Sequence, residues 1–280
     1  MMLKVFSPAK INLFLKIIRK RSDGYHELSS LFQTIDLGDT LTFELSSKDS
    51  LTCTDPLIPT NETNLVLKAT QLFRNKTGFS TNFKIHLLKQ IPIQAGLGGG
   101  SSNAASTLWA CNNLTGNKIS IADLQQWSAE IGSDIPFFFS EGTAYCTGRG
   151  EHVQNLSPLT KQHCWIIKPK VGLSTPEVYS RFRLKSDSNL NVASNADIKR
   201  FFNESPYYIN DLEQPAFEAK PELEEIKNNL LKCGFKTVLL SGSGSAFFCL
   251  GEGTPSISND FTSFSTHFLN RSPIHWYENS

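Results

Sequence analysis

The segment from Pro92 to Ser102 has the composition of an anion-binding turn. Glycine occupies positions 96, 98, 99 and 100, and two serines follow. Glycine lets the backbone approach a phosphate closely and adopt positive φ, and the free N–H groups at the start of a helix favour negative charge. The serine hydroxyls can contact phosphate oxygens or a bound metal. We therefore predict a phosphate-binding loop that consists of Gly96, Leu97, Gly98, Gly99, Gly100, Ser101 and Ser102.

Two better-known phosphate-binding patterns do not fit this segment. A Walker loop requires a lysine after its last glycine, whereas Ser101 follows Gly100. A dinucleotide fingerprint requires a third glycine where Ser101 stands. A flexible glycine linker is the remaining alternative, but a predicted strand (83–88) precedes the segment and a predicted helix (103–113) follows it. This placement favours phosphate binding.

Lys10 and Asp134 are the second candidates for chemistry. Transfer of phosphate to an alcohol needs aligned reactants, neutralised charge and a group that takes the hydroxyl proton. A carboxylate within hydrogen-bond reach can accept that proton, and a neighbouring ammonium can stabilise the developing alkoxide. A single Lys or Asp is more often a solvated surface group. The two residues form a catalytic pair only if the fold brings them together.

The elements around these residues are mixed. Apolar residues alternate along 11–18, as in a strand with one buried face. Further strands are predicted over 28–35, 40–45, 83–88, 164–168, 237–240 and 246–250. Apolar stripes predict helices over 64–76 (ended by Gly78), 103–113, 120–132 and 221–233 (capped by Gly234), and the polar stretch 186–195 is predicted to be an exposed connection. Strands and helices without regular alternation indicate an α+β fold.

Composition limits the classes of function. The 280 residues suffice for two lobes that share a cleft. Lys and Arg number 27 and Asp and Glu 26, and this balance argues against nucleic-acid or membrane-surface binding. No apolar run approaches the roughly 18 residues of a membrane span. The six scattered cysteines suit a reducing cytosol, and no Ser- and Arg-rich leader is visible. We therefore expect a bacterial cytoplasmic protein.

Three segments together resemble the GHMP kinase superfamily, which includes galactokinase, homoserine kinase and mevalonate kinase. They are Pro-Ala-Lys-Ile-Asn-Leu at 8–13, Gly-Leu-Gly-Gly-Gly-Ser-Ser-Asn-Ala-Ala at 96–105, and Ser-Gly-Ser-Gly-Ser-Ala at 241–246. The middle motif is highly specific, the first moderately so, and the third is weak by itself. The resemblance implies an S5-like, ATP-binding N-terminal lobe (1–160), a ferredoxin-like C-terminal lobe (161–280), and an active site in the cleft between them.

Two further segments are most similar to the branch of the superfamily that phosphorylates a cytidine diphospho-alcohol in the non-mevalonate route to isoprenoid precursors. They are 21–28, which contains Asp-Gly-Tyr-His, and 131–138. This resemblance implies ATP and Mg²⁺ as cofactors. It also implies that Lys10 and Asp134 are catalytic, with Asp134 as the base, that the glycine loop wraps the ATP phosphates, that Asn12 orients the substrate, and that Asn64 lies by the adenine.

The same resemblance implies that Tyr25, His26 and Tyr179 form the cytidine pocket. Flat rings stack on a pyrimidine, and His26 can hydrogen-bond its edge. A half-exposed turn without a ligand is the alternative for Tyr25 and His26. Tyr179 is assigned from the preceding Thr175 and Pro176, at a position where the family often has phenylalanine.

Three other functions stay open at this point. Another kinase of the superfamily, for homoserine or mevalonate, would differ mainly in the pocket residues. A ligand-binding regulator on the same fold would lack turnover, although the presence of both Lys10 and Asp134 argues for catalysis. RNA binding would suit an S5-like lobe, but a basic stripe is missing. The magnesium ligands are open, and a monomer or weak homodimer is expected.

Overall fold

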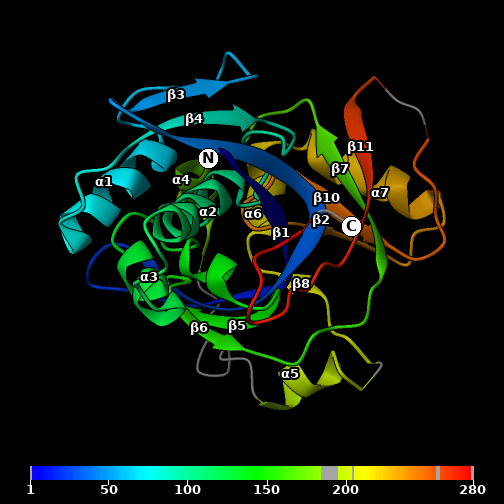
Figure 1. Cartoon of the computed structure of the whole chain (residues 1–280). Coiled ribbons are helices and arrows are strands. Elements are labelled where there is room, and N and C mark those ends of the chain that lie inside the picture. The colour runs from blue at the N-terminus through cyan, green and yellow to red at the C-terminus, as the bar shows by residue number, and fades with distance from the viewer. Residues whose placement is uncertain (1, 184–194, 204, 257–258, 279–280) are drawn as a thin grey trace.

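A computed structural model describes residues 2–183, 195–203, 205–256 and 259–278. Its larger sheet is built on two long antiparallel strands, β1 and β2 (Figure 1). The strand order is β3-β4-β2-β1-β8, and β5 pairs with β2 and then with β6. The strands are β1 (Met2–Lys20), β2 (His26–Ser46), β3 (Ser50–Cys53), β4 (Asn82–Leu88), β5 (Thr143–Gly148), β6 (His152–Asn155) and β8 (Ile209–Asn210).

The prediction of two separate strands over 28–35 and 40–45 was wrong, because both belong to β2. Pro8 of β1 pairs with Gly38 of β2, and the next residue, Ala9, pairs with Ile35. The two extra residues of β2 form a bulge, which bends a strand without ending it. The same long ladder extends β1 beyond both ends of the predicted strand 11–18 and places Lys10 directly after the bulge.

Four helical segments accompany this sheet, and they are α1 (Leu65–Thr77), α2 (Gly99–Leu114), α3 (Ile121–Ser128) and the short 3₁₀ helix η1 (Pro136–Phe139). The helix predicted over 64–76 is confirmed. Asn64 caps its N-terminus, because its side chain accepts the Val66 N–H, and Gly78 closes it at φ 75°. Ser120 caps α3 as predicted, but the helix already ends at Ser128.

The smaller sheet is antiparallel, with the order β11-β7-β10-β9. Its strands are β7 (His163–Pro169), β9 (Thr237–Leu240), β10 (Phe247–Leu250) and β11 (Phe261–His267), and its helices are α4 (Thr175–Arg181), α5 (Asn195–Arg200), α6 (Glu213–Ala219) and α7 (Glu222–Lys232). The helix and strands predicted here are confirmed, and so is the α+β class. Of the predicted connection 186–195, all but its last residue, Asn195, lie outside the described residues.

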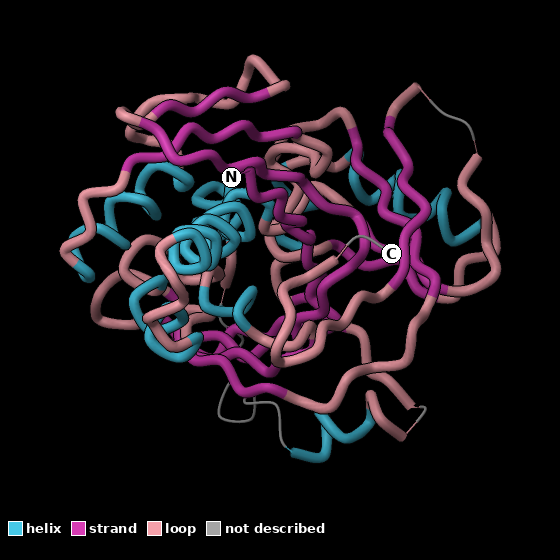
Figure 2. The backbone as a smooth tube through the Cα atoms, viewed as in Figure 1, coloured by secondary structure: helices cyan, strands magenta, loops and turns pink. Residues whose placement is uncertain are grey.

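A shared core joins the two sheets, whose strands are drawn in magenta in Figure 2. Ile11 and Leu31 of the larger sheet pack in one cluster with Ile166 and Phe248 of the smaller one. After β7 of the smaller sheet, the chain returns to the larger sheet, where β8 pairs with β1. A rigid junction of this kind holds side chains from both sheets in fixed relation. The division into lobes at residue 160 stays a prediction.

Candidate active site

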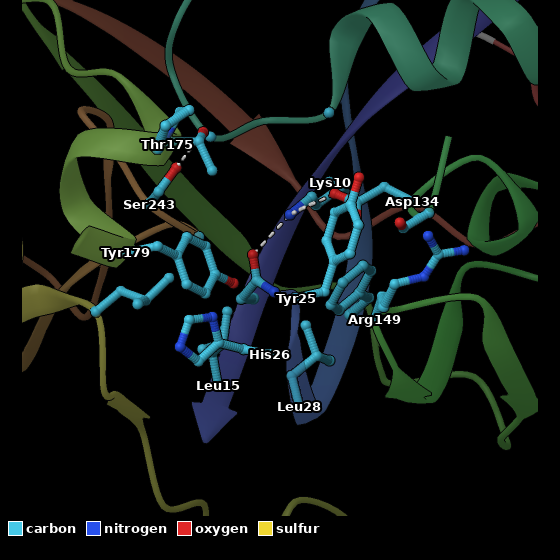
Figure 3. Close-up of a pocket in the computed structure, with 18 of the residues that line it drawn as sticks. Lys10, Leu15, Tyr25, His26, Leu28, Asp134, Arg149, Thr175, Tyr179 and Ser243 are labelled. Atoms are coloured by element: carbon cyan, nitrogen blue, oxygen red, sulfur yellow. Dashed lines mark hydrogen bonds and ion pairs between the residues drawn. The ribbon is translucent and has the colours of Figure 1, made fainter. Parts of the chain in front are cut away.

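A cavity of about 690 Å³ lies where the two sheets meet. Side chains that accompany both sheets line it: Lys10 and Asn12 of β1 and Asp134 before η1 accompany the larger sheet, and Tyr179 of α4 and Ser243 accompany the smaller one. Figure 3 shows Asp134 on one side of this cavity and Tyr179 on the other. A concave site built from converging polar groups is the usual form of a small-molecule site.

Lys10 and Asp134 meet in this cavity. Nζ of Lys10 lies 3.6 Å from Oδ2 of Asp134 and donates a 2.7 Å hydrogen bond to Oδ1 of Asn12. Asn12 is itself fixed, because its Nδ2 donates to Oγ of Ser30. The Lys10 side chain is 4% exposed, whereas that of Asp134 is 35% exposed. The structure therefore places a buried ammonium beside a carboxylate that a ligand can reach.

The glycine loop separates this cavity from a second one of about 390 Å³. Gly96 and Gly98 line both cavities, whereas Gly99, Gly100, Ser101 and Asn64 line only the second. Because the two cavities share this wall, a phosphate held by the loop lies between them. This arrangement suits two ligands that meet end to end.

The helix after the loop begins earlier than predicted, at Gly99 instead of Asn103. Glycine is a poor helix former, and this property concealed the start of α2 in the sequence. Gly98 precedes the helix with φ 69°. The free N–H groups of the first helical turn therefore belong to the last loop residues themselves.

The third motif, residues 241–246, holds the glycine loop in place. A Cβ on Gly96, which has φ +73°, would lie 2.0 Å from the carbonyl oxygen of Ser241. Ser241 Oγ donates to the Gly96 carbonyl at 3.0 Å, and Ala246 N–H donates to the carbonyl of Ala95 at 3.1 Å. The two motifs, far apart in sequence, therefore form one interlocked unit.

Two of the predicted nucleotide-binding residues have structural partners. Ser102 is fully buried and its Oγ accepts from Ser7 Oγ at 2.8 Å, so it lies behind the loop. Asn64 lines the second cavity, but its Oδ1 caps α1 and its Nδ2 donates to the carbonyl of Pro59. Both side chains are thus engaged in contacts within the protein.

The three residues predicted for the cytidine pocket line the first cavity. The rings of His26 and Tyr179 lie 5.0 Å apart, and Tyr25 is 56% exposed. Burial lowers the pKa of His26, and the charge of Lys20 adds to this effect. Burial raises the pKa of Tyr179, and the Asp134 charge raises it further. The pocket therefore favours a neutral imidazole and a neutral phenol.

Sequence reasoning missed six polar residues of this cavity, namely Lys20, Ser133, Arg149, Thr175, Ser180 and Ser243. Thr175 Oγ1 and Ser243 Oγ lie 2.8 Å apart and join α4 to the third motif. Arg149 lies between Gly148 and Gly150, both at positive φ. Paired glycines around a charged residue mark a tight turn, which was the available signal.

The sequence resembles known proteins over nearly its whole length. Residues 64–142 match the family described as GHMP kinases N terminal domain, and residues 191–267 match GHMP kinases C terminal. A 4-diphosphocytidyl-2-C-methyl-D-erythritol kinase of Protochlamydia amoebophila is 59% identical over 98% of this chain and 93% of its own length. The chloroplastic enzyme of that name from Arabidopsis thaliana is 46% identical over 99% of this chain and 76% of its own length.

The chain belongs to the 4-diphosphocytidyl-2-C-methyl-D-erythritol kinase family.

Solved structures agree with this membership. A crystal structure of 4-(cytidine 5'-diphospho)-2C-methyl-D-erythritol kinase superposes with a TM-score of 0.80 at 32% identity, and the match covers 96% of this chain and 100% of the other. A homoserine kinase from Cytophaga hutchinsonii, at 19% identity and a TM-score of 0.67, shares the fold over 97% of this chain and 96% of its own. The predicted superfamily, its two-domain fold and its kinase activity are thus confirmed.

The structure also bears on metal and membrane binding. Among the described residues, no three His, Cys, Asp or Glu side chains gather as metal ligands. Mg²⁺ in kinase sites is held by one or two protein oxygens together with substrate phosphates, so a dedicated cluster is not required. No helix in the part of the chain that the structure describes is long and apolar enough to span a bilayer.

Proposed function

We propose that this chain transfers the γ-phosphate of ATP to the 2-hydroxyl of 4-diphosphocytidyl-2-C-methyl-D-erythritol, as the names of its relatives indicate for them. The observation that carries the proposal is the position of the Lys10–Asp134 pair, in the cavity that shares the glycine loop with a second cavity. ATP would occupy the second cavity with its phosphates on the loop. The alcohol would occupy the first.

In this proposal Asp134 is the base. Its carboxylate accepts the proton of the 2-hydroxyl while that oxygen bonds to the γ-phosphorus, and the bond from phosphorus to the β–γ bridging oxygen breaks to release ADP. Lys10 stabilises the negative charge on the acceptor oxygen. Asn12 holds the Lys10 ammonium in place and helps to orient the substrate.

The loop from Gly96 to Ser102 would wrap the ATP phosphates through its backbone N–H groups, and Asn64 would line the adenine end of the same cavity. Mg²⁺, when bound, would neutralise charge on the phosphate oxygens. The hydroxyl of Ser101 in the first turn of α2 lines that cavity and is a suitable protein oxygen for the metal.

Tyr25, His26 and Tyr179 would bind the cytosine. Their rings supply stacking surfaces, and a neutral His26 keeps one nitrogen that accepts a hydrogen bond from the amino group of the base. A monomer or weak homodimer stays a prediction. So does a cytoplasmic location, which the six free cysteines support.

The direct test follows ADP release with one alcohol at a time. We expect turnover with the cytidine diphospho-alcohol and little with homoserine or mevalonate, because the ring pocket is built for a nucleobase. Turnover of homoserine without turnover of the cytidine compound would refute the substrate assignment. ATP hydrolysis without any acceptor preference would refute the proposed cytidine pocket.

A further inference from the structure

We propose that Arg149 binds the diphosphate of the substrate and thereby sets specificity for a nucleoside diphosphate ester over a simple alcohol. The inference rests on the proposed function. It concerns a cation of the first cavity that has no part in the Lys10–Asp134 pair.

Arg149 lies between the cytosine pocket and the acceptor site. Its guanidinium carbon is 5.1 Å from the centroid of the Tyr25 ring. The next residue, Gly150, packs against Asp134, and a Cβ placed on it would lie 3.1 Å from Oδ1 of that carboxylate. Figure 3 shows Tyr25, Arg149 and Asp134 along the same stretch of the cavity wall. In a cytidine diphospho-alcohol the diphosphate occupies this intermediate position.

The charges of the cavity leave Arg149 available for an anion. The charged side chains of Lys10, Lys20, Asp134 and Arg149 line it, and Lys10 is already engaged with Asp134. The Arg149 side chain pairs with Glu151 through Nε, at 3.3 Å, and Glu151 does not line the cavity. In the described part of the chain, this is the one hydrogen bond of the Arg149 side chain. Its two terminal amino groups form the fork that suits phosphate oxygens.

Arg149 lies in a tight turn between β5 and β6, whose backbone is fixed by two glycines and a hydrogen bond. Gly148 has φ +72° and Gly150 has φ +118°, conformations that favour glycine. The Glu151 carboxylate accepts the backbone N–H of Arg149 at 2.5 Å and so closes the turn. A guanidinium on a fixed turn loses less conformational entropy on binding than one on a free loop.

Arg149 lines only the first cavity, whereas the second contains most of the glycine loop. The effect of changing it is therefore expected on the alcohol substrate and not on ATP. A positively charged group near the ATP phosphates would give the opposite pattern. This difference separates a diphosphate contact from a general electrostatic contribution.

The test compares cytidine and CDP as probes of Arg149→Met by titration calorimetry. We expect the affinity for CDP to fall roughly tenfold, as for the loss of a charge-assisted hydrogen bond, while the affinity for cytidine stays within about twofold. Arg149→Lys, which keeps the charge without the planar fork, should recover part of the CDP affinity. In turnover assays KM for the cytidine diphospho-alcohol should rise in Arg149→Met with KM for ATP unchanged.

Arg19→Met is the matched control, because Arg19 is exposed, pairs with Glu27 and lies outside the cavity lining. It should leave both affinities unchanged. Equal losses for cytidine and CDP in Arg149→Met would show that the arginine acts only by holding the Tyr25 ring, and would overturn the inference. Unchanged CDP affinity would overturn it as well. Both binding results are independent of turnover, so they are distinct from a failure of the proposed function.

Discussion

Lys10 carries a charge in a place where charge is costly. Its side chain is almost fully buried, and its ammonium lies 4.5 Å from the centroid of the Phe32 ring. A buried charge is tolerated when it is paired and hydrogen-bonded, and Asn12 and Asp134 meet that need. A hydrophobic residue at position 10 would avoid the free-energy cost of removing a charge from water. The role proposed for Lys10 in the reaction would account for this buried ammonium.

The role proposed for His26 predicts that substrate binding is sensitive to acid. Its pKa is lowered, chiefly by burial, so the neutral ring persists as pH falls to the ordinary histidine value of about 6.5. Protonation sets in only below that pH and removes the acceptor nitrogen. We expect KM for the cytidine diphospho-alcohol to rise as the pH falls below that ordinary value, while KM for ATP changes little.

Steady-state kinetics of the wild type and His26→Gln over this pH range check the prediction. Glutamine keeps an acceptor that does not titrate, so the acid rise in KM should disappear in the variant. An identical rise in both proteins would assign the effect to another group.

At the scale of elements, the glycine loop depends on its contact with the third motif. Gly96→Ala would force a Cβ to within 2.0 Å of the Ser241 carbonyl at a residue of positive φ. We expect a loss of roughly 2–4 kcal/mol in stability, from strain and displaced backbone, together with a weaker affinity for ATP. Thermal unfolding and ATP titration measure the two effects.

Gly100→Ala is the stability control from the same loop. Its Cβ would have a nearest contact of 3.5 Å, to the Leu65 side chain, and alanine favours a helix over glycine. Its melting temperature should match or exceed that of the wild type. If the two alanine variants were equally stable, the interlock of the loop with Ser241 would not be needed.

The sequence predicted most elements of this fold but not their continuity. The helices at 64–76 and 221–233 have clear apolar stripes and caps, and the structure contains both. The continuity of 28–35 with 40–45 was missed, because a glycine such as Gly38 is typical of turns. In the structure Gly38 lies within β2, next to the bulge. The early start of α2 was missed because local propensity does not include the packing that holds Gly99 in a helix.

The sequence predicted which residues belong to the candidate site but not which of them are in contact. Lys10, Asp134 and the glycine loop were singled out from their chemistry, yet their proximity depends on long-range pairing that no local pattern encodes. Arg149 was missed because a single arginine in a short turn carries no periodic signal. Thr175 and Ser243 were missed because their 2.8 Å contact joins segments that are distant in the sequence.

At the scale of the whole molecule, the C-terminal segment returns to the larger sheet. Trp276 packs in the core of the larger sheet, stacks on Trp109 at 5.3 Å, and donates its indole N–H to the Phe6 carbonyl. The end of the chain thereby supports the sheet that carries Lys10. The parts of the chain built on the two sheets are expected to unfold as one cooperative unit.

Trp276→Ala should destabilise the protein by about 3–5 kcal/mol, as for other buried aromatic residues cut to alanine. Ile274→Ala is the control from the same segment, because Ile274 is 84% exposed, and it should change stability by no more than about 0.5 kcal/mol. Chemical denaturation followed by fluorescence and circular dichroism measures both. A small effect of Trp276→Ala, or separate transitions in the wild type, would contradict this view of the junction.

In the proposed reaction, the Asp134 carboxylate takes the proton of the acceptor hydroxyl beside Lys10. The most direct test is the single-turnover rate of Asp134→Asn with ATP and the cytidine diphospho-alcohol, measured alongside the binding affinity for that alcohol. The rate should fall roughly a hundredfold to ten-thousandfold, with affinity within a few-fold of wild type, while Glu130→Gln, a change of an exposed surface carboxylate, leaves both unchanged. A wild-type rate in Asp134→Asn would contradict the account.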